Sequence, residues 1–324
     1  MSAQTQKSAP KGLTRLCPII LMSSLDLPIR AATETAVRHG IQPDRCDILQ
    51  NASTLVLRLT ENLVARVVTD VDGPRKGTEW FARENAIAAH LTRHGAPAIP
   101  LHPDLPPGPH EHLGYTLNFW QFVTITEDPP ANAAAGRTLQ QCHAILSSFP
   151  EPLPSLAIVR ESIDLLQTLR DKSLLPSPTI EMLGAHLEEA LQVLAHHPQQ
   201  ALHGDAHPGN LLNTTGGLRW TDWEDAFAGP VEWDVASFIW NPLLLDNDVS
   251  TANQIVAAYC KAGGRLDLEA MNQCLIARAA VITAWYPVLY PNPNADRQNK
   301  LQRRIHWLES LSPHRGTDFG LILP

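Results

Sequence analysis

Apolar and polar positions in the first third of the chain recur with the periods of strands and helices. Arg30 to His39 has a helical pattern that ends at a glycine. Thr54 to Leu59 and Leu63 to Thr69 are rich in β-forming residues and are separated by three polar residues, which predicts a hairpin with a tight turn. Thr78 to His94 has apolar side chains at helical spacing and predicts a helix. Tyr115 to Val123 is rich in aromatic residues and predicts a buried strand.

The pattern becomes mainly helical after the two prolines at positions 129 and 130. Helices are predicted for Ala131 to Ser148, Val159 to Asp171, Thr179 to His196, Val231 to Trp240, Val249 to Ala262, Leu268 to Leu289 and Asp296 to Leu311. Two short strands interrupt them, near Asn210 to Asn213 and Leu218 to Thr221, and a turn from Thr214 to Gly217 joins these strands. The chain is therefore predicted to be α+β, with a smaller lobe of antiparallel strands and one helix at 26–123 and a larger, mainly helical lobe at 124–324.

Length and composition agree with this two-lobed prediction. The 324 residues exceed one compact unit of ordinary size, which favours two lobes around a shared cleft. Apolar residues make up 44% and charged residues 18% of the chain, as in globular proteins. Residues 1–25 show no sustained period and are expected to form an N-terminal extension.

Charge and hydropathy argue against two classes of partner. A net charge of −8 and a pI near 5.9 are unlike those of nucleic-acid-binding proteins, which carry basic surfaces that displace counterions. No apolar run approaches the roughly 20 residues needed to cross a bilayer, so no membrane partner is expected. The five cysteines are scattered without a Cys-x-x-Cys pair, as expected of reduced thiols in a cytoplasmic protein. The sequence predicts no particular oligomeric state.

The segment from His203 to Asp225 carries the candidate chemistry. His203, Asp205 and Asn210 have the spacing of a kinase catalytic loop, in which the aspartate accepts the proton of a substrate hydroxyl and the asparagine holds a metal ion. The predicted hairpin, with two glycines at its turn, brings Asp222 beside Asn210. Their oxygens are the hard ligands that Mg²⁺ requires when it bridges nucleotide phosphates.

Three ordered motifs extend this spacing. They are His203-Gly-Asp-Ala-His-Pro-Gly-Asn210, Thr221-Asp-Trp-Glu-Asp225 and Gly229-Pro-Val-Glu-Trp-Asp-Val-Ala236. In these motifs the chain resembles the aminoglycoside phosphotransferase and choline kinase family, which has the protein-kinase fold. The resemblance implies a protein-kinase-like two-lobed fold and the transfer of a γ-phosphoryl group, with Mg²⁺, from ATP or GTP to a hydroxyl of a small molecule. Aminoglycosides, amino sugars, amino alcohols and related metabolites are the acceptors that this resemblance suggests.

The resemblance also assigns roles to residues of the larger lobe. Asp205 is expected to be the catalytic base, and Asn210 and Asp222 are expected to hold Mg²⁺. His203 is expected to support the catalytic loop. Asp234 is similar to the family's structural aspartate near the start of a helix.

The smaller lobe is expected to bind the nucleotide. Arg66 lies where kinases have a phosphate-binding lysine, and Glu84 is its expected ion-pair partner. The loop before the first strand lacks a Gly-x-Gly-x-x-Gly pattern, so phosphate contacts there are expected from backbone amides and from the hydroxyl of Ser53 or Thr54. Backbone groups of three further residues are expected to meet the purine: Gln121, Phe122 and Val123.

Two alternative functions fit the same residues, and two segments are candidates for the wall of the acceptor site. A kinase fold that only binds a ligand is favoured by the missing glycine pattern. A metal hydrolase is the second alternative, because histidine and aspartate also suit zinc or iron; its ligands would be His203, Asp205, His207 and Asp222. For the acceptor wall, two segments are expected: the helix from Leu268 to Leu289, with Trp285 and Tyr286, and the segment from Trp240 to Asp248, with Asp246 and Asp248.

Overall fold

Strands of the N-terminal third form one antiparallel sheet. In the computed structural model, which describes residues 25–52, 54–70, 78–106, 108–311 and 319–323, the strands pair in the order β1-β2-β3-β5-β4. They are β1 (Asp47–Asn51), β2 (Thr54–Arg58), β3 (Leu63–Val68), β4 (His110–His112) and β5 (Tyr115–Gln121). The predicted hairpin (β2 and β3) and the predicted aromatic strand (β5) are confirmed. Strands β1 and β4 are additions: β1 is exposed at every residue, so it shows no alternation, and β4 is very short.

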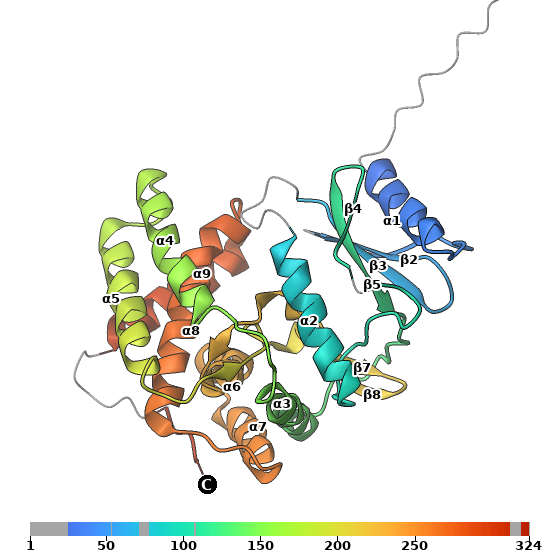
Figure 1. The fold of residues 1–324 in the computed structure, drawn as a ribbon. Helices are drawn as coiled ribbons and strands as arrows, with labels where there is room; N and C mark the ends of the chain where they lie inside the picture. The colour runs from blue at the N-terminus through green and yellow to red at the C-terminus, as the bar shows by residue number, and fades with distance from the viewer. Residues whose placement is uncertain (1–24, 53, 71–77, 107, 312–318, 324) are drawn as a thin grey trace, which may run out of the picture.

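Alternation along these strands gives the sheet two different faces (Figure 1). Helix α1 (Asp26–Arg38) packs its alanines on one face, against fully buried side chains such as Leu57 and Val67. On β3 the intervening position is Arg66, which therefore points to the opposite face. That face is turned toward α2 (Glu79–Arg93), which lies between the sheet and the helical part of the chain. The period of the strand thus places Arg66 at the junction of the two parts.

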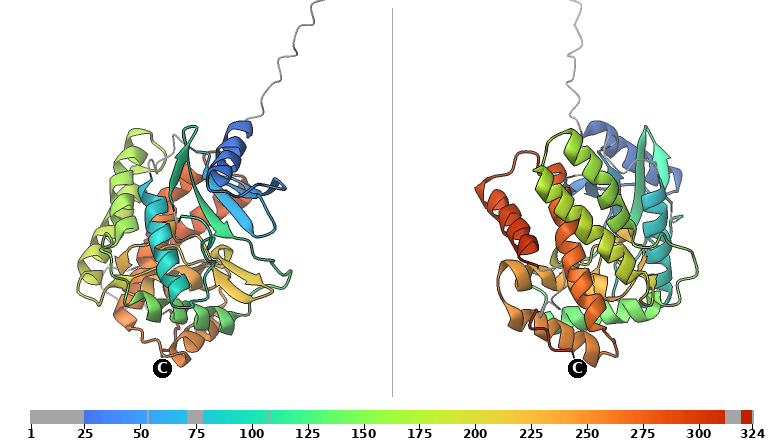
Figure 2. Two further views of the ribbon diagram at one scale, coloured as in Figure 1. Left: turned by 45° about the vertical axis from the view of Figure 1, so that its right-hand side comes forward. Right: turned by 90° about the vertical axis from the view of Figure 1, so that its left-hand side faces the viewer.

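The helical part is arranged around α8, as Figure 2 shows from two further sides. Its helices are α3 (Asn132–Leu146), α4 (Ala157–Asp171), α5 (Ser177–Leu194), α6 (Glu232–Trp240), α7 (Val249–Lys261), α8 (Leu268–Leu289) and α9 (Ala295–Ser310). Helices α4, α5, α6 and α9 all pack against α8, whose buried face is almost entirely apolar, and α3 pairs with α7. The seven helices expected from periodicity are confirmed, with ends close to the predicted ones.

Short strands and turns connect the two parts. The predicted second hairpin is formed by β7 (Leu211–Thr214) and β8 (Gly217–Trp220), and β6 (Gln200–Ala201) pairs with β9 (Ala228–Gly229). Single helical turns occur at Pro208–Asn210, Trp223–Asp225 and, as a π-helical turn, Asn241–Leu245. The β8 strand is also hydrogen-bonded to the segment after α2, where the Ile99 N–H donates to the Trp220 carbonyl at 2.8 Å. The hairpin is therefore anchored to both parts.

The sequence analysis also predicted a boundary between two lobes, an N-terminal extension and no membrane span. The division into 26–123 and 124–324 falls between β5 and α3 and stays a prediction. The expected extension, residues 1–25, lies outside the described residues except for Leu25. Within the described part of the chain, none of the helices combines the length and apolar character that crossing a bilayer requires.

Candidate active site

A cavity of about 390 Å³ separates the sheet and α2 from the helical part. Its lining comes from β2, β3, α2, α4, α8 and the three segments that follow β3, β6 and β8, and it includes both Asp205 and Asp222. Asp205 belongs to the loop at 203–210, between β6 and β7, and Asp222 follows β8. The two carboxylates that the sequence singled out therefore face one space.

A buried aspartate holds the backbone of the 203–210 loop. Asp234, at the start of α6, is fully buried and accepts hydrogen bonds from the His203 N–H at 2.7 Å and the Gly204 N–H at 2.9 Å. It also accepts one from Nε2 of His143 at 2.9 Å. Three donors on one carboxylate fix the loop to the helical part, because removing any of them would leave a buried charge less compensated. The geometry agrees with the structural role expected for Asp234.

His203 and Gly204 set the local shape of this loop. Nε2 of His203 donates to the Thr221 carbonyl at 2.9 Å, and its Nδ1 accepts from the Asp205 N–H at 3.4 Å. The side chain of His203 is fully buried and links the loop to β8, so it supports the loop and does not line the cavity. Gly204 has φ +85°, and a Cβ there would lie 2.0 Å from the carbonyl oxygen of Asp225. Only glycine fits that position without displacing the loop.

Asp205 is paired with an arginine that the sequence analysis did not select. The Arg278 Nη2 donates to Oδ1 of Asp205, and His207 Nε2 lies 3.4 Å from Oδ2. Burial alone would raise the pKa of Asp205, but the charge of Arg278, with the hydrogen bond from His207 and the charges of both neighbouring histidines, holds that pKa well below its usual range. Arg278 is the single basic residue in the long apolar run of α8, and this isolation is the signal that could have identified it.

The two expected metal ligands lie side by side. The Thr221 N–H donates to the Asn210 carbonyl at 3.0 Å, which continues the β7–β8 ladder and places Asp222 next to Asn210. Nδ2 of Asn210 donates to the Asp205 carbonyl at 3.0 Å, so the side-chain oxygen of Asn210 is left for another partner. Oδ1 of Asp222 is buried and has an ion-pair contact but no well-formed hydrogen bond among the described residues. This donor set of hard oxygens fits Mg²⁺.

Arg66 is surrounded by three carboxylates. Its Nη1 lies 2.7 Å from Oε1 of Glu84, and its Nη2 lies 2.8 Å from Oδ1 of Asp222 and 2.9 Å from Oε2 of Glu224. Oε2 of Glu84 accepts a further hydrogen bond from Asn118 at 2.9 Å. The expected Arg66–Glu84 pair is present, and Glu224 is an additional partner of Arg66.

The pKa values of this group reflect its excess of negative charge. Burial, reinforced by Asp222 and Glu224, raises the pKa of Glu84 to about 8 against the attraction of Arg66. Burial alone would lower the pKa of Arg66, but the three carboxylates hold it above its ordinary value. Even with Glu84 neutral, the two carboxylates of Asp222 and Glu224 face one guanidinium, so the group is suited to a further cation.

The other residues expected to bind the nucleotide differ in whether the structure leaves them accessible to a ligand. Thr54 lines the cavity at the start of β2, whereas Ser53 lies outside the described residues. The N–H of Gln121 donates to the Pro100 carbonyl at 3.0 Å and that of Phe122 to the Asn62 carbonyl at 2.7 Å. These two N–H groups are thus used within the N-terminal part. The Val123 N–H has no backbone acceptor among the described residues, so it is the donor of the three that a ligand could use.

The expected acceptor wall is partly supported by the geometry. Trp285 of α8 lines the cavity, but Tyr286 is buried elsewhere and stacks on Tyr290 at 4.8 Å between ring centroids. Asp248 accepts from the Thr251 N–H at 3.0 Å and caps α7, and neither Asp248 nor Asp246 lines the cavity. A carboxylate before a helix is as often a cap as a ligand, and here it is a cap.

The model of one protein family matches most of the chain. It is described as the phosphotransferase enzyme family, and it matches residues 33–271, which include the sheet, the 203–210 loop and Asp222. The chain belongs to this phosphotransferase family. No protein of curated function matches the chain by sequence.

Solved structures with the same fold include kinases. An amicoumacin kinase, hAmiN, solved with AMP-PNP, Ca²⁺ and Ami, is 16% identical over 89% of this chain and 95% of its own, with a TM-score of 0.71. A choline/ethanolamine kinase family protein from Mesorhizobium loti is 18% identical over 87% and 96%, with a TM-score of 0.60. The choline kinase LicA from Streptococcus pneumoniae is 15% identical over 86% and 98%, with a TM-score of 0.63. At these identities the likeness shows the fold, and it confirms the predicted kinase-like α+β architecture.

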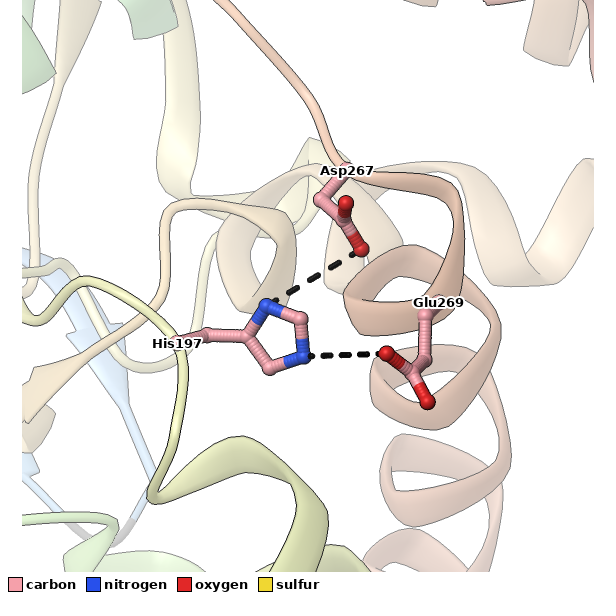
Figure 3. A group of neighbouring side chains, drawn as sticks. All are labelled: His197, Asp267 and Glu269. Atoms are coloured by element: carbon pink, nitrogen blue, oxygen red, sulfur yellow. Dashed lines mark ion pairs between the residues drawn. The ribbon is translucent and has the colours of Figure 1, made fainter.

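The geometry does not support the metal-hydrolase alternative, whose expected ligands included His203. Both ring nitrogens of His203 are hydrogen-bonded to the backbone, so His203 has no nitrogen left to bind a metal ion. Among the described residues, the group of His, Cys, Asp and Glu side chains close enough to share an ion is His197, Asp267 and Glu269 (Figure 3). In this group the imidazole lies between the two carboxylates, 3.9 Å and 3.8 Å from their oxygens, near the start of α8 and outside the cavity.

Proposed function

We propose that the protein is a small-molecule kinase that transfers the γ-phosphoryl group of ATP or GTP to a hydroxyl of a small-molecule acceptor. One observation carries this proposal: Asp205 and Asp222 line the same cavity, and each is paired with its own arginine, Arg278 or Arg66. Phosphoryl transfer needs this pair of functions, because one carboxylate must orient the hydroxyl while another holds the metal that accompanies the phosphates.

Asn210 and Asp222 would hold Mg²⁺. Asp222 and Glu224 converge on Arg66 next to Asn210, and their negative charge exceeds what one guanidinium neutralises. When bound, Mg²⁺ and the nucleotide supply the charge compensation and the transferable phosphoryl group. Arg66 would contact phosphate oxygens from the sheet side as a fork of two donors. The Val123 N–H would donate to the purine edge, and the Thr54 hydroxyl would lie near the phosphates.

Asp205 would act on the acceptor. Its Oδ1 is fixed by Arg278, which leaves Oδ2, on the side of His207, to accept a hydrogen bond from the acceptor hydroxyl. Its depressed pKa makes it a weak base. A weak base suits a loose transition state, in which the hydroxyl is oriented first and its proton is transferred late. The role of this chain is then to position the hydroxyl and to receive its proton at one oxygen of Asp205.

A thermal-shift experiment tests the nucleotide half of the proposal. ATP or GTP should raise the melting temperature of the parent protein only when Mg²⁺ is present, and Asp222→Ala should abolish that shift because it removes the proposed metal ligand. Asp246→Ala is the matched control, since Asp246 is an exposed carboxylate outside the cavity. A parent protein without any shift would contradict the proposal. A normal shift without ADP release for any acceptor would favour the kinase fold that only binds a ligand.

A further inference from the structure

A second cavity, of about 510 Å³, lies within the helical part and shares no lining residue with the candidate active site. Its walls come from α3, the segment between α5 and β6, the start of α6, the end of α7 and the segment before α8. His197, Glu232 and Asp267 line it together, so an imidazole and two carboxylates reach one space. The proposed phosphoryl transfer uses none of these three side chains.

His197 lies between two carboxylates at the edge of this second cavity (Figure 3). Its Nδ1 is 3.9 Å from Oδ1 of Asp267, and its Nε2 is 3.8 Å from Oε2 of Glu269. Both separations exceed the length of a hydrogen bond. One ligand atom from each of the three side chains lies within 4.8 Å of the other two. In a tetrahedral zinc site with bonds of about 2.1 Å, ligand atoms are about 3.4 Å apart, so these atoms have to approach by roughly 1 Å to share an ion.

The two carboxylates have oxygens available for that approach. The side chain of Glu269 is 77% exposed, so it is free to turn toward the imidazole. Oδ1 of Asp267 accepts from the Ala270 N–H at 3.0 Å and caps α8, which leaves Oδ2 for another partner. Capping accounts for the position of Asp267, but it does not account for an imidazole placed between two carboxylates.

Negative charge around His197 is not balanced by a nearby lysine or arginine. Glu232 is a third carboxylate: it is 6% exposed, and its Oε1 accepts from the Asp267 N–H at 2.7 Å. Burial raises the pKa of Glu232, and the charge of Asp267 raises it further. Among the described residues, none of the three carboxylates forms an ion pair with lysine or arginine, and Arg265, an exposed residue of the same cavity, forms none either. A bound cation would supply the missing positive charge.

We infer that His197, Asp267 and Glu269 bind one divalent cation of the zinc class. One imidazole nitrogen with two carboxylate oxygens is a donor set that suits zinc, whereas Mg²⁺ takes oxygen ligands. The fourth position is open to a water molecule from the second cavity. This site is separate from the Mg²⁺ ligands proposed at Asn210 and Asp222, and it needs no nucleotide.

Zinc chloride serves as the probe for this site. Parent protein freed of metal by EDTA and dialysed against Zn²⁺ in excess Mg²⁺ should retain one equivalent of zinc more than His197→Ala does. His196→Ala is the matched control, because it removes the neighbouring imidazole, which is exposed and forms no ion pair among the described residues. Asp222→Ala should also keep that equivalent, since the candidate active site is elsewhere. Equal zinc content in the parent and His197→Ala would overturn the inference.

A second variant tests the site without touching a packed side chain. Glu269→Gln alters only an exposed carboxylate, and isothermal titration should show Zn²⁺ binding weakened by at least about tenfold, the effect seen even for residues outside a ligand shell. Because the ion joins the segment after α5 to the start of α8, Zn²⁺ should also raise the melting temperature of the parent more than that of Glu269→Gln. Glu188→Gln, at an exposed glutamate of α5 outside the second cavity, is the control. Equal zinc affinities in the two glutamine variants would contradict the site.

Discussion

Two arginines, Arg66 and Arg278, pair with carboxylates at the cavity, and they differ in the number of carboxylates that each contacts. Among the carboxylates of the described residues, Arg66, from the sheet, contacts Glu84, Asp222 and Glu224, whereas Arg278, from α8, contacts Asp205. Even with Glu84 neutral, Asp222 and Glu224 leave a surplus of negative charge around one guanidinium, while the Asp205–Arg278 pair is balanced. The difference indicates that the sheet side is built to receive a cation and that the α8 side is built to keep one carboxylate ionised and oriented.

The largest expected effect comes from replacing Asp205, the carboxylate of the balanced Asp205–Arg278 pair. Asp205→Asn keeps the shape of the side chain but removes the base, so kcat for acceptor-dependent ADP release should fall about 10³-fold, within the range of general-base contributions. The Mg²⁺-dependent nucleotide shift should be retained, because Asp222 is untouched. Steady-state kinetics with any acceptor found in a screen would measure it, and near-normal turnover would remove Asp205 from its proposed role.

The unbalanced side should be the more sensitive of the two to loss of its arginine. Arg66→Met would leave three carboxylates without their cation, one of them fully buried, and should lower the free energy of unfolding by about 3–5 kcal/mol. Urea denaturation of the ligand-free protein would measure the change. Arg66→Lys, which keeps the charge but not the planar fork, should lose clearly less. Equal losses in the two variants would show that side-chain packing, rather than charge, accounts for the effect.

The surplus charge also predicts a dependence on pH. The pKa of Glu84 is raised from 4.5 to about 8, so its neutral form is favoured in the folded protein, and the stability that it contributes is present at low pH and lost as pH rises from about 4.5 through about 8. Glu84→Gln mimics the neutral form and should remove this loss. Urea denaturation of both proteins across that range measures the difference, and parallel curves would contradict a raised pKa.

The balanced and unbalanced sides also differ in how much of them could be predicted from sequence. Asp205, Asn210 and Asp222 were identified because their spacing is local and a hairpin turn brings the last two together. The Arg66–Glu84 pair followed from the period of one strand and the helix after it. The structure brings these residues together as expected because neighbours along the chain determine their placement, and their roles stay predictions.

Arg278 could not be found in this way. It meets Asp205 across a separation of 73 residues, and only the packing of α8 against the rest of the helical part determines which face of the helix turns to the cavity. Glu224 is similar, because its choice between solvent and Arg66 depends on where β3 lies relative to the turn after β8. Strand β1 escaped prediction for another reason: all of its residues are exposed, so burial imposes no alternation on them.

A third arginine, Arg304, is buried and forms no ion pair with a carboxylate among the described residues. The guanidinium of Arg304, on α9, lies over the rings of Trp240 at 4.7 Å and Tyr286 at 4.9 Å. Its Nε and Nη1 have no hydrogen-bond acceptor among the described residues, and burial lowers its pKa. Contact with aromatic rings replaces ion pairing at this position.

The smallest effect is therefore expected for Arg304→Met. The lost cation–π contacts, worth about 1–2 kcal/mol, are offset because a buried charge with no carboxylate partner among the described residues is removed, so the free energy of unfolding should change by less than about 1 kcal/mol. Urea denaturation under the conditions used for Arg66→Met gives a direct comparison. If the two variants lost equal stability, the number of carboxylates around an arginine would not explain its contribution, and an anionic partner of Arg304 would have to be sought.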